Sequence, residues 1–319
     1  MISKAELNKS PFLQLILLLC LCLISLVIFS VIGGLLAATV YGFNPTEINN
    51  LGDPKMIKGM KLLQLFSALG LFIVPPLVYG LFTAKNPIEN LGLSKVNAPF
   101  NYLLVLVLMV VLTPFLSWVI ELNANMIFPE FLSGIEAWMR SSESKAELLT
   151  KAFLTFDGIG SLILVMVIVA IVPAIGEELL FRGVLQKLMI RWTKNPHVGI
   201  WIAAFLFSAL HLQFFGFFPR LLLGALFGYL FLWTNSLWVP ILGHFINNGT
   251  VVMASYFYPE LINDADFTLF GAENANWITT FFSLFLATAL LFLIWKLNRK
   301  NKTNKPHYGL DRESQSSKM

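Results

Sequence analysis

Long stretches without a charged residue dominate this chain. No Asp, Glu, Lys or Arg occurs between Lys9 and Glu47, and a second uncharged stretch reaches from Gly158 to Gly176. A run of about 18 or more apolar residues without charge is long enough to cross a bilayer as a helix. Of the 319 residues, 57% are hydrophobic and 13% are charged, about half the charged share of a typical soluble domain. The sequence therefore predicts an all-α, polytopic membrane protein.

Eight segments have the length and apolar composition of transmembrane helices. They cover residues 12–40, 62–83, 100–120, 160–192, 197–212, 220–233, 237–256 and 277–295. An even number of spans puts both chain ends on one side of the membrane. Lys and Arg are concentrated on that same side, and the positive-inside rule makes it the cytoplasmic one. We therefore expect a multi-pass protein of the cytoplasmic (inner) membrane, if the source is bacterial, with the 257–276 loop outside.

The chain divides into one large membrane domain and a short tail. We assign residues 1–295 to a single membrane domain, and residues 296–319, which are polar and basic, to a disordered cytoplasmic tail. The connection 121–157 mixes apolar and charged residues in a pattern that suits a helix lying at the membrane interface, or else an ordinary surface loop. The net charge of +4 comes largely from the tail, so it indicates no nucleic-acid partner.

The two cysteines indicate no covalent or metal chemistry. Cys20 and Cys22 lie in the first apolar run. Two residues spaced by two on a helix point to different sides, so neither a disulfide nor a metal clamp is expected. We interpret both as packing or lipid-facing residues.

One polar cluster interrupts the fourth apolar segment, in the stretch 173–186. Glu177, Glu178 and Arg182 lie where a charge costs roughly 2.5 to 3.5 kcal/mol to insert, so such groups mark a functional site. Glu178 and Arg182 are four residues apart and share one helix face, whereas Glu177 lies about 100° around the helix. We therefore predict that Arg182 holds Glu178 and that Glu177 is left to do chemistry.

Further polar residues occur in later apolar segments. If residues 193–196 turn the chain back, Glu178 and His211 lie at equal depth, each roughly 24 Å from that turn. His244 lies roughly 15 Å beyond the turn at Asn235, and Asn248 follows one helical turn deeper. Three segments that are distant in the sequence thus send polar groups toward one layer of the membrane, as a catalytic site requires.

Prolines and glycines accompany these polar residues. Pro173 precedes Glu177 by four residues and Pro240 precedes His244 by four. A proline within a helix frees the carbonyl four residues earlier and bends the helix. Gly176 and Gly243 stand directly before the polar residues, where another backbone can come close.

The residue types in this layer suit attack by water. Glu177 with His211 can deprotonate a water, or hold a metal that does so. His244 and Asn248 both carry donors that can stabilise the oxyanion formed on a peptide carbonyl. No Ser, Thr or Cys has an evident base partner in the sequence, which argues against a covalent acyl-enzyme.

Three motifs now resemble a known family. They are Glu177-Glu178-x-x-x-Arg182, Phe207-x-x-x-His211 and His244-x-x-x-Asn248, and they are similar to those of the CAAX protease and bacteriocin-processing (CPBP) family of intramembrane proteases. The resemblance covers residues 160–256. It implies about eight transmembrane helices around an intramembrane catalytic cavity. It further implies that Glu177 and His211 activate the water, that His244 and Asn248 bind the oxyanion, and that Glu178 and Arg182 support the site.

The resemblance leaves several alternatives open. A divalent metal such as zinc, held by Glu177, His211 and His244, stands beside a purely glutamate-dependent mechanism, because the set lacks a firm zinc spacing. The expected partner is a membrane-associated peptide or protein in the bilayer, processed in the manner of a CAAX protein or of bacteriocin maturation and immunity. A catalytically idle membrane scaffold and a proton-coupled transporter are the competing functions.

Overall fold

The computed structural model describes residues 10–47, 51–93, 99–260 and 276–299. Every regular element in these ranges is a helix, as the sequence predicts for an all-α membrane protein. Most of the predicted outer loop 257–276 and the tail beyond residue 299 lie outside the described residues. The last helix runs to Asn298, three residues beyond the predicted span, and the division into a membrane domain and a tail stays a prediction.

Six helices among the described residues are long and apolar enough to cross a membrane. Three are single helices: α2 (Pro11–Tyr41), α6 (Phe100–Ala124) and α15 (Trp277–Asn298). One, Phe214–Thr234, is a short turn followed by α12 (Phe217–Thr234). The other two are interrupted by π-helical turns. Pro54–Thr83 consists of α3 (Pro54–Ala68), a π-helical turn and α4 (Val74–Thr83). Ile159–Thr193 contains three α-helical parts, α8 (Ile159–Val165), α9 (Val172–Glu178) and α10 (Gln186–Thr193).

Two further helices fall at the remaining predicted positions. They are α11 (Pro196–Ala209) and α13 (Trp238–Phe257). The first has 14 residues, fewer than the roughly 20 that span a bilayer. The prediction that it continues through His211 is wrong, because the helix ends at Ala209. The polytopic architecture is confirmed, and the count of eight crossings stays a prediction.

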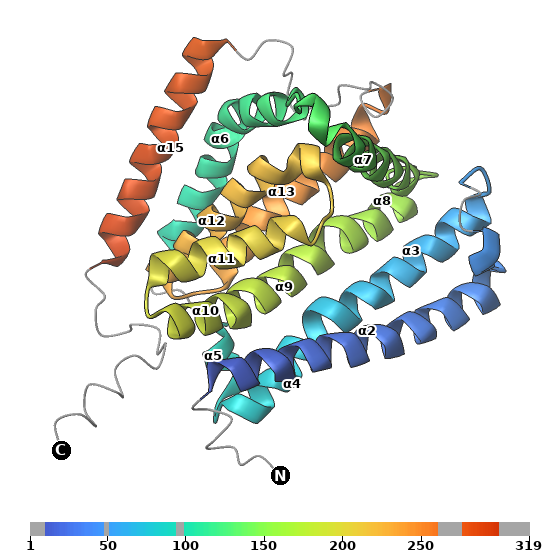
Figure 1. Ribbon diagram of the computed structural model, residues 1–319, viewed down its shortest axis with the longest axis horizontal. Coiled ribbons are helices and arrows are strands. Elements are labelled where there is room, and N and C mark those ends of the chain that lie inside the picture. Colours follow the sequence, from blue (N-terminus) through green and yellow to red (C-terminus); the bar gives the residue numbers. More distant parts are fainter. Residues whose placement is uncertain (1–9, 48–50, 94–98, 261–275, 300–319) are drawn as a thin grey trace.

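The helices form a bundle in which the long helix α8–α10 lies between two groups (Figure 1). On one side pack α2, α3 and α4, and on the other α11, α12 and α13, with α6 and α15 beyond them. Buried polar contacts join these layers. The hydroxyl of Tyr79 and the guanidinium of Arg191 both donate to Oε1 of Gln14, at 2.6 and 2.9 Å. Asn101 and Asn298 exchange hydrogen bonds of 3.1 Å between α6 and α15.

The connection 121–157 contains a helix, α7 (Ser133–Phe153), and so the alternative of an ordinary loop is wrong. Its large apolar side chains Ile135, Trp138 and Leu148 are exposed. Its polar face carries the ion pair between Glu136 and Arg140. These two faces are those of an amphipathic helix, the type that lies in a membrane interface.

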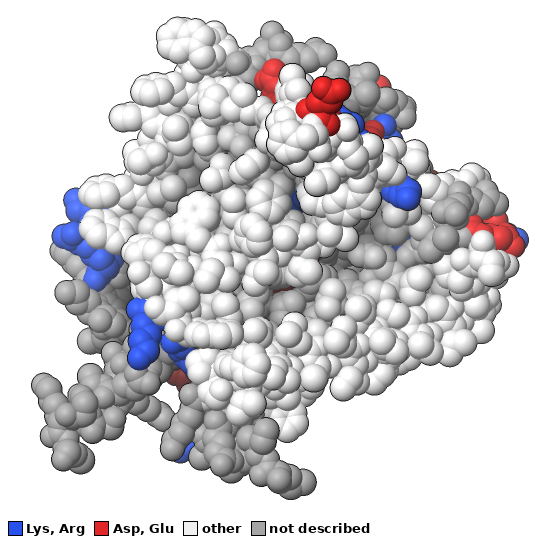
Figure 2. Space-filling model, in the orientation of Figure 1, with Lys and Arg blue, Asp and Glu red and all other residues white. Residues whose placement is uncertain are grey.

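The surface pattern agrees with a membrane setting. Figure 2 shows a broad face without charged side chains, while Lys, Arg, Asp and Glu gather at its margins. Exposed Leu, Ile, Val and Phe side chains are numerous on α2 and α15. Such a band of apolar surface is far larger than soluble proteins expose, and lipid is its natural solvent.

Candidate active site

The helix that carries Glu177 and Glu178 is irregular on both sides of the two acids. A π-helical segment, Met166–Ile171, precedes α9, and a second one, Leu179–Leu185, follows it. Pro173 lacks the N–H that a regular helix would use, which favours the first irregularity. Single π-helical turns are frequent at functional sites because they redirect the side chains around them.

Glu178 is the centre of a buried ion cluster. Its Oε1 atom accepts a hydrogen bond of 2.8 Å from Nη1 of Arg182, as the spacing of four residues predicts. The same oxygen lies 2.9 Å from Nδ1 of His244, which comes from α13. A carboxylate accepts only, so Nδ1 of His244 is the donor. Glu178 therefore fixes both the guanidinium and the orientation of the imidazole.

Arg182 and His244 are further enclosed by aromatic rings. The Arg182 guanidinium lies 4.8 Å from the ring centre of Phe207 and 5.6 Å from that of Phe227. The His244 ring stacks on Phe227 with 5.5 Å between centroids. Nη2 of Arg182 also donates to the backbone oxygen of Gly224, at 3.0 Å. Aromatic faces attract cations, and this dry surrounding strengthens each charge interaction.

Glu177 is buried beside this cluster but is held differently. Its Oε2 atom lies 3.8 Å from Nε2 of His244, beyond hydrogen-bond distance. That oxygen has no hydrogen-bond partner among the described residues, and the residue as a whole is 8% exposed. Oε2 of Glu178 also has no hydrogen-bond partner among the described residues, so the two acids differ in that Oε1 of Glu178 accepts from Arg182 and His244, whereas Glu177 makes no hydrogen bond to either in the described structure. Glu177 and Glu178 are thus in unlike surroundings.

Gly176 allows the acidic helix to pack closely against the first layer. A Cβ atom at this position would lie 2.7 Å from Cβ of Phe72, in the π-helical turn Leu69–Ile73. Only a glycine fits this approach without displacement of a neighbour. The N-terminal helices therefore form one wall of the site.

Asn248 donates a hydrogen bond to the backbone oxygen that Pro173 leaves free in the acidic helix. Pro173 leaves the backbone oxygen of Val169 without its usual helical donor. Nδ2 of Asn248 donates to that oxygen at 3.0 Å, while its Oδ1 accepts from Asn247 at 3.1 Å. The contact joins α13 to the helix of Glu177, and the second hydrogen of the amide is left for another acceptor.

His211 lies apart from the ion cluster. It is exposed, in the connection beyond Ala209, and its Nδ1 lies 2.8 Å from the backbone oxygen of Phe207. Among the described residues, no hydrogen bond or ion pair joins it to Glu177. The Phe207 ring contacts both histidines, with centroids 5.1 Å from His211 and 6.0 Å from His244. The structure therefore brings together Glu177, Glu178, Arg182 and His244, with His211 one aromatic ring away.

Among the described residues, no group of three or more His, Cys, Asp and Glu side chains is placed so as to hold an ion. A metal held by Glu177, His211 and His244 stays a prediction.

Gln186 is a buried residue of the acidic stretch to which the sequence analysis assigned no role. Its Nε2 donates to the backbone oxygen of Gly228 at 3.1 Å, one turn along α12 from the carbonyl that Arg182 binds. The spacing of four residues between Arg182 and Gln186 was the available signal. The two side chains together fix the acidic helix against α12.

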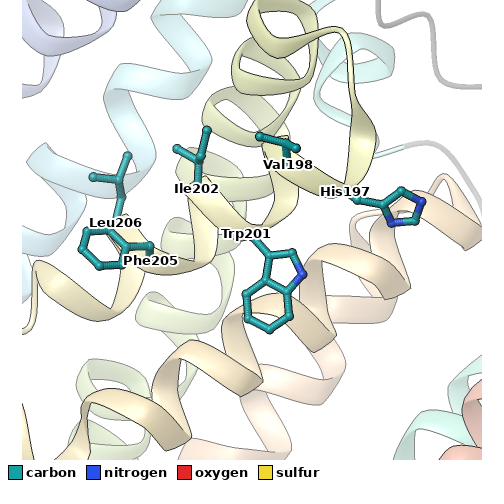
Figure 3. Close-up of a pocket in the computed structure, with 6 residues that line it drawn as sticks. All are labelled: His197, Val198, Trp201, Ile202, Phe205 and Leu206. Carbon is teal, nitrogen blue, oxygen red and sulfur yellow. The ribbon is translucent and has the colours of Figure 1, made fainter.

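A hollow on the outer face of α11 lies away from this cluster (Figure 3). It is lined by the side chains His197, Val198, Trp201, Ile202, Phe205 and Leu206. None of these residues belongs to the three motifs. His197 bonds instead to the hydroxyl of Tyr229, 3.0 Å from its Nδ1.

Comparison with known proteins supports the motif assignment. Residues 159–250 match the family model described as type II CAAX prenyl endopeptidase Rce1-like. The uncharacterized protein YpbD of Bacillus subtilis (strain 168) is 34% identical over 85 residues, which are 25% of this chain and 40% of that protein. The chain thus spans less than half the length of this curated relative. No solved structure matches.

Proposed function

Because residues 159–250 form an Rce1-like domain of the CPBP family, we propose that this protein is an intramembrane endopeptidase. It hydrolyses a peptide bond of a membrane-associated protein or peptide by attack of an activated water. The observation that carries the proposal is the buried cluster of Glu177, Glu178, Arg182 and His244 inside that domain. The protein crosses the membrane eight times, with both ends in the cytoplasm and the cluster within the bilayer.

Glu177 is the general base of the proposed reaction. Its Oε2 atom is buried beside the His244 ring and has no hydrogen-bond partner in the described structure, which suits a group that receives a proton from water. A water bound to Oε2 gives its proton to Glu177 as the water oxygen attacks the carbonyl carbon of the substrate. The protonated Glu177 then gives its proton to the leaving amine. His211 assists through Nε2, the nitrogen that remains unprotonated when Nδ1 donates to Phe207.

The oxyanion is stabilised by donors from α13. When the His244 ring carries both protons, its Nε2–H can donate to the oxyanion, as can the second amide hydrogen of Asn248; both are directed by contacts already made on their other atoms, to Glu178 and to Val169. Donors fixed in this way lower the energy of the developing charge without reorganisation. Glu178 and Arg182 support the site by holding His244 in one orientation.

The test compares host membranes that contain the wild-type protein with membranes that contain Glu177→Gln. Peptidomics of the two should reveal at least one membrane peptide or protein that is cut only by the wild type. Asp157→Asn is the matched control, since it also removes one carboxylate but from the surface pair with Lys58. It should process the same substrate at the wild-type rate.

Two results would contradict the proposal. Equal peptide profiles for the wild type and Glu177→Gln would favour a catalytically idle scaffold. Proton-coupled uptake into vesicles that depends on Glu177, in the absence of any cleavage, would favour a transporter. Cleavage by purified protein in lipid nanodiscs, lost in Glu177→Gln and kept in Asp157→Asn, would support an endopeptidase.

A further inference from the structure

His211 stands in the connection between α11 and α12, outside either helix. Because the backbone oxygen of Phe207 only accepts, Nδ1 of His211 carries the proton and Nε2 keeps its lone pair. The direction of Nε2 is what decides whether this ring can act as a base. That direction depends on how the connection 210–216 and the first residues of α12 are held.

The end of α6 holds this connection through one buried amide. Nδ2 of Asn123 donates to the backbone oxygen of Phe214 at 3.1 Å. Oδ1 of the same side chain accepts from the backbone N–H of Phe218 at 2.9 Å. Asn123 is buried and thus uses both ends of its amide on the loop that follows His211.

Helix α7 holds the same connection from a second side. Oε2 of Glu143 accepts from the backbone N–H of Phe215 at 3.3 Å. The Arg140 guanidinium lies 4.6 Å from the ring centre of Phe215, and the rings of Trp138 and Phe214 are 5.0 Å apart. In Figure 1, α7 lies at the opposite end of the bundle from α5 (Pro87–Leu91) and α10.

Helix α12 completes the enclosure of the loop. Arg220 donates to the backbone oxygen of Gln213 at 3.0 Å and to its Oε1 at 2.7 Å. Ser208 donates to the backbone oxygen of Phe217 at 2.6 Å, which ties the end of α11 to the start of α12. The residues that follow His211 are therefore contacted by side chains of α6, α7 and α12, and Ser208 of α11 bonds to the first residue of α12.

We propose that Asn123 and Glu143 are positioning residues for His211. The end of α6 and helix α7 hold the connection 210–216 and the first residues of α12 so that Nε2 of His211 points toward the reacting water. This inference rests on the proposed function. It gives the segment 121–157 a part in catalysis that goes beyond its lying at the membrane surface.

The test is a double-mutant cycle in the purified, full-length protein. Asn123→Ala should lower kcat about tenfold and leave KM nearly unchanged, because misplacement of a catalytic group affects the transition state more than substrate binding. In a His211→Ala background the same substitution should lower kcat less than about twofold, since the group that it positions is gone. Glu143→Ala should behave alike. Glu147→Gln, which removes an exposed α7 ion pair with Lys151, is the control and should change neither constant.

A second measurement does not depend on turnover. The chain has four histidines, so their ¹⁵N ring signals can be assigned by replacing them one at a time. The wild type should give the His211 signals of an Nδ1-protonated ring. Asn123→Ala should shift or broaden these signals, while those of His197, bonded to Tyr229 elsewhere, should stay unchanged.

The outcomes separate the two proposals. Unchanged His211 signals in Asn123→Ala, or a tenfold loss in both backgrounds, would overturn the positioning role and leave the endopeptidase standing. Full activity of Glu177→Gln would remove the endopeptidase mechanism and the positioning role together.

Discussion

Replacement of Glu178 by glutamine should lower the free energy of unfolding of this protein, whereas the same change at Glu177 should not. Glu178 accepts from Arg182 at 2.8 Å and from His244 at 2.9 Å, and both of these side chains are buried. Glutamine has nearly the same shape as glutamate and keeps one of the two acceptor oxygens. It removes the negative charge that pairs directly with the buried guanidinium.

The size of the effect follows from these two contacts. Loss of one partner of a buried ion pair costs about 3 to 5 kcal/mol. The lower end applies here, because Arg182 keeps its bond to Gly224 and its contacts with the Phe207 and Phe227 rings. We expect about 3 kcal/mol, which corresponds to a fall of roughly 6 to 12 °C in Tm if each kcal/mol lowers Tm by about 2 to 4 °C. Among the described residues, Glu177 has no such partner within hydrogen-bond distance, and His244 lies 3.8 Å away.

The assay is thermal unfolding in one detergent, followed together with cleavage of a fluorogenic membrane peptide. Glu178→Gln should lose both stability and activity, and Glu177→Gln should lose activity alone. Asp157→Asn is the control. The Lys58 hydrogen bond holds the pKa of Asp157 below its usual range, so this pair is charged at neutral pH, yet it is exposed and should not alter Tm.

A compensating variant sharpens the test. Arg182→Met combined with Glu178→Gln removes the unpaired cation, so the double variant should be more stable than Glu178→Gln alone. If Glu177→Gln and Glu178→Gln melt and turn over alike, the division of roles between the two acids is wrong. An additive loss in the double variant would refute the argument from the buried ion pair.

Three other predictions concern the mechanism and the topology. Asn248→Ala should lower kcat about 100- to 1000-fold with little change in KM, as loss of an oxyanion donor does. Asn248→Asp should be worse, because it places negative charge near the oxyanion and opposite the Val169 carbonyl; a fully active Asp variant would refute this role. Protein stripped of metal by a chelator should keep its activity; inactivation with recovery on addition of zinc would refute a purely glutamate-dependent mechanism. Reporter fusions at residues 264 and 300 should give opposite signals, and equal signals would refute eight crossings.

The helical architecture and the Glu178–Arg182 pair could be predicted because each depends on local sequence. Uncharged apolar runs identify helices by length and composition. A spacing of four residues puts an acid and a base on one helix face whatever the rest of the fold does. Pro173 likewise predicts that the backbone oxygen of Val169 lacks its helical donor. The sequence does not show which side chain donates to that oxygen instead.

The equal depth of Glu178 and His211 stays a prediction, and it was calculated from straight helices. The calculation assumed a constant rise from the turn at residues 193–196. A π-helical turn has a different rise and twist, and such a turn lies between Glu178 and α10. Helix α11 also ends two residues before His211. Each irregularity alters the register that the calculation needs.

The partner of His244 could not be predicted either, because it depends on tertiary packing. The sequence places His244 and Asn248 one turn apart on α13, which predicts a shared task. In the structure their contacts diverge: Nδ1 of His244 donates to Glu178, and the amide of Asn248 donates to Val169. Both acceptors belong to the long helix α8–α10, nine residues apart. A pair on one helix face thus fixes α13 to its neighbour at two levels.

Neighbouring acids on one helix show how a membrane protein can hold a supporting and a reactive carboxylate together. Consecutive residues point about 100° apart, so burial of both is possible while only one meets the cations. Glu178 meets Arg182 and His244, which offset the cost of removing its charge from water. Glu177 makes no hydrogen bond to either cation in the described structure, and its Oε2 lies 3.8 Å from Nε2 of His244. A neutral side chain of the same shape would cost less to bury than this carboxylate. A catalytic role therefore explains Glu177 better than a role in packing does. Glu177→Gln should therefore be at least as stable as the wild type, and a marked loss of stability would show that Glu177 is a structural residue.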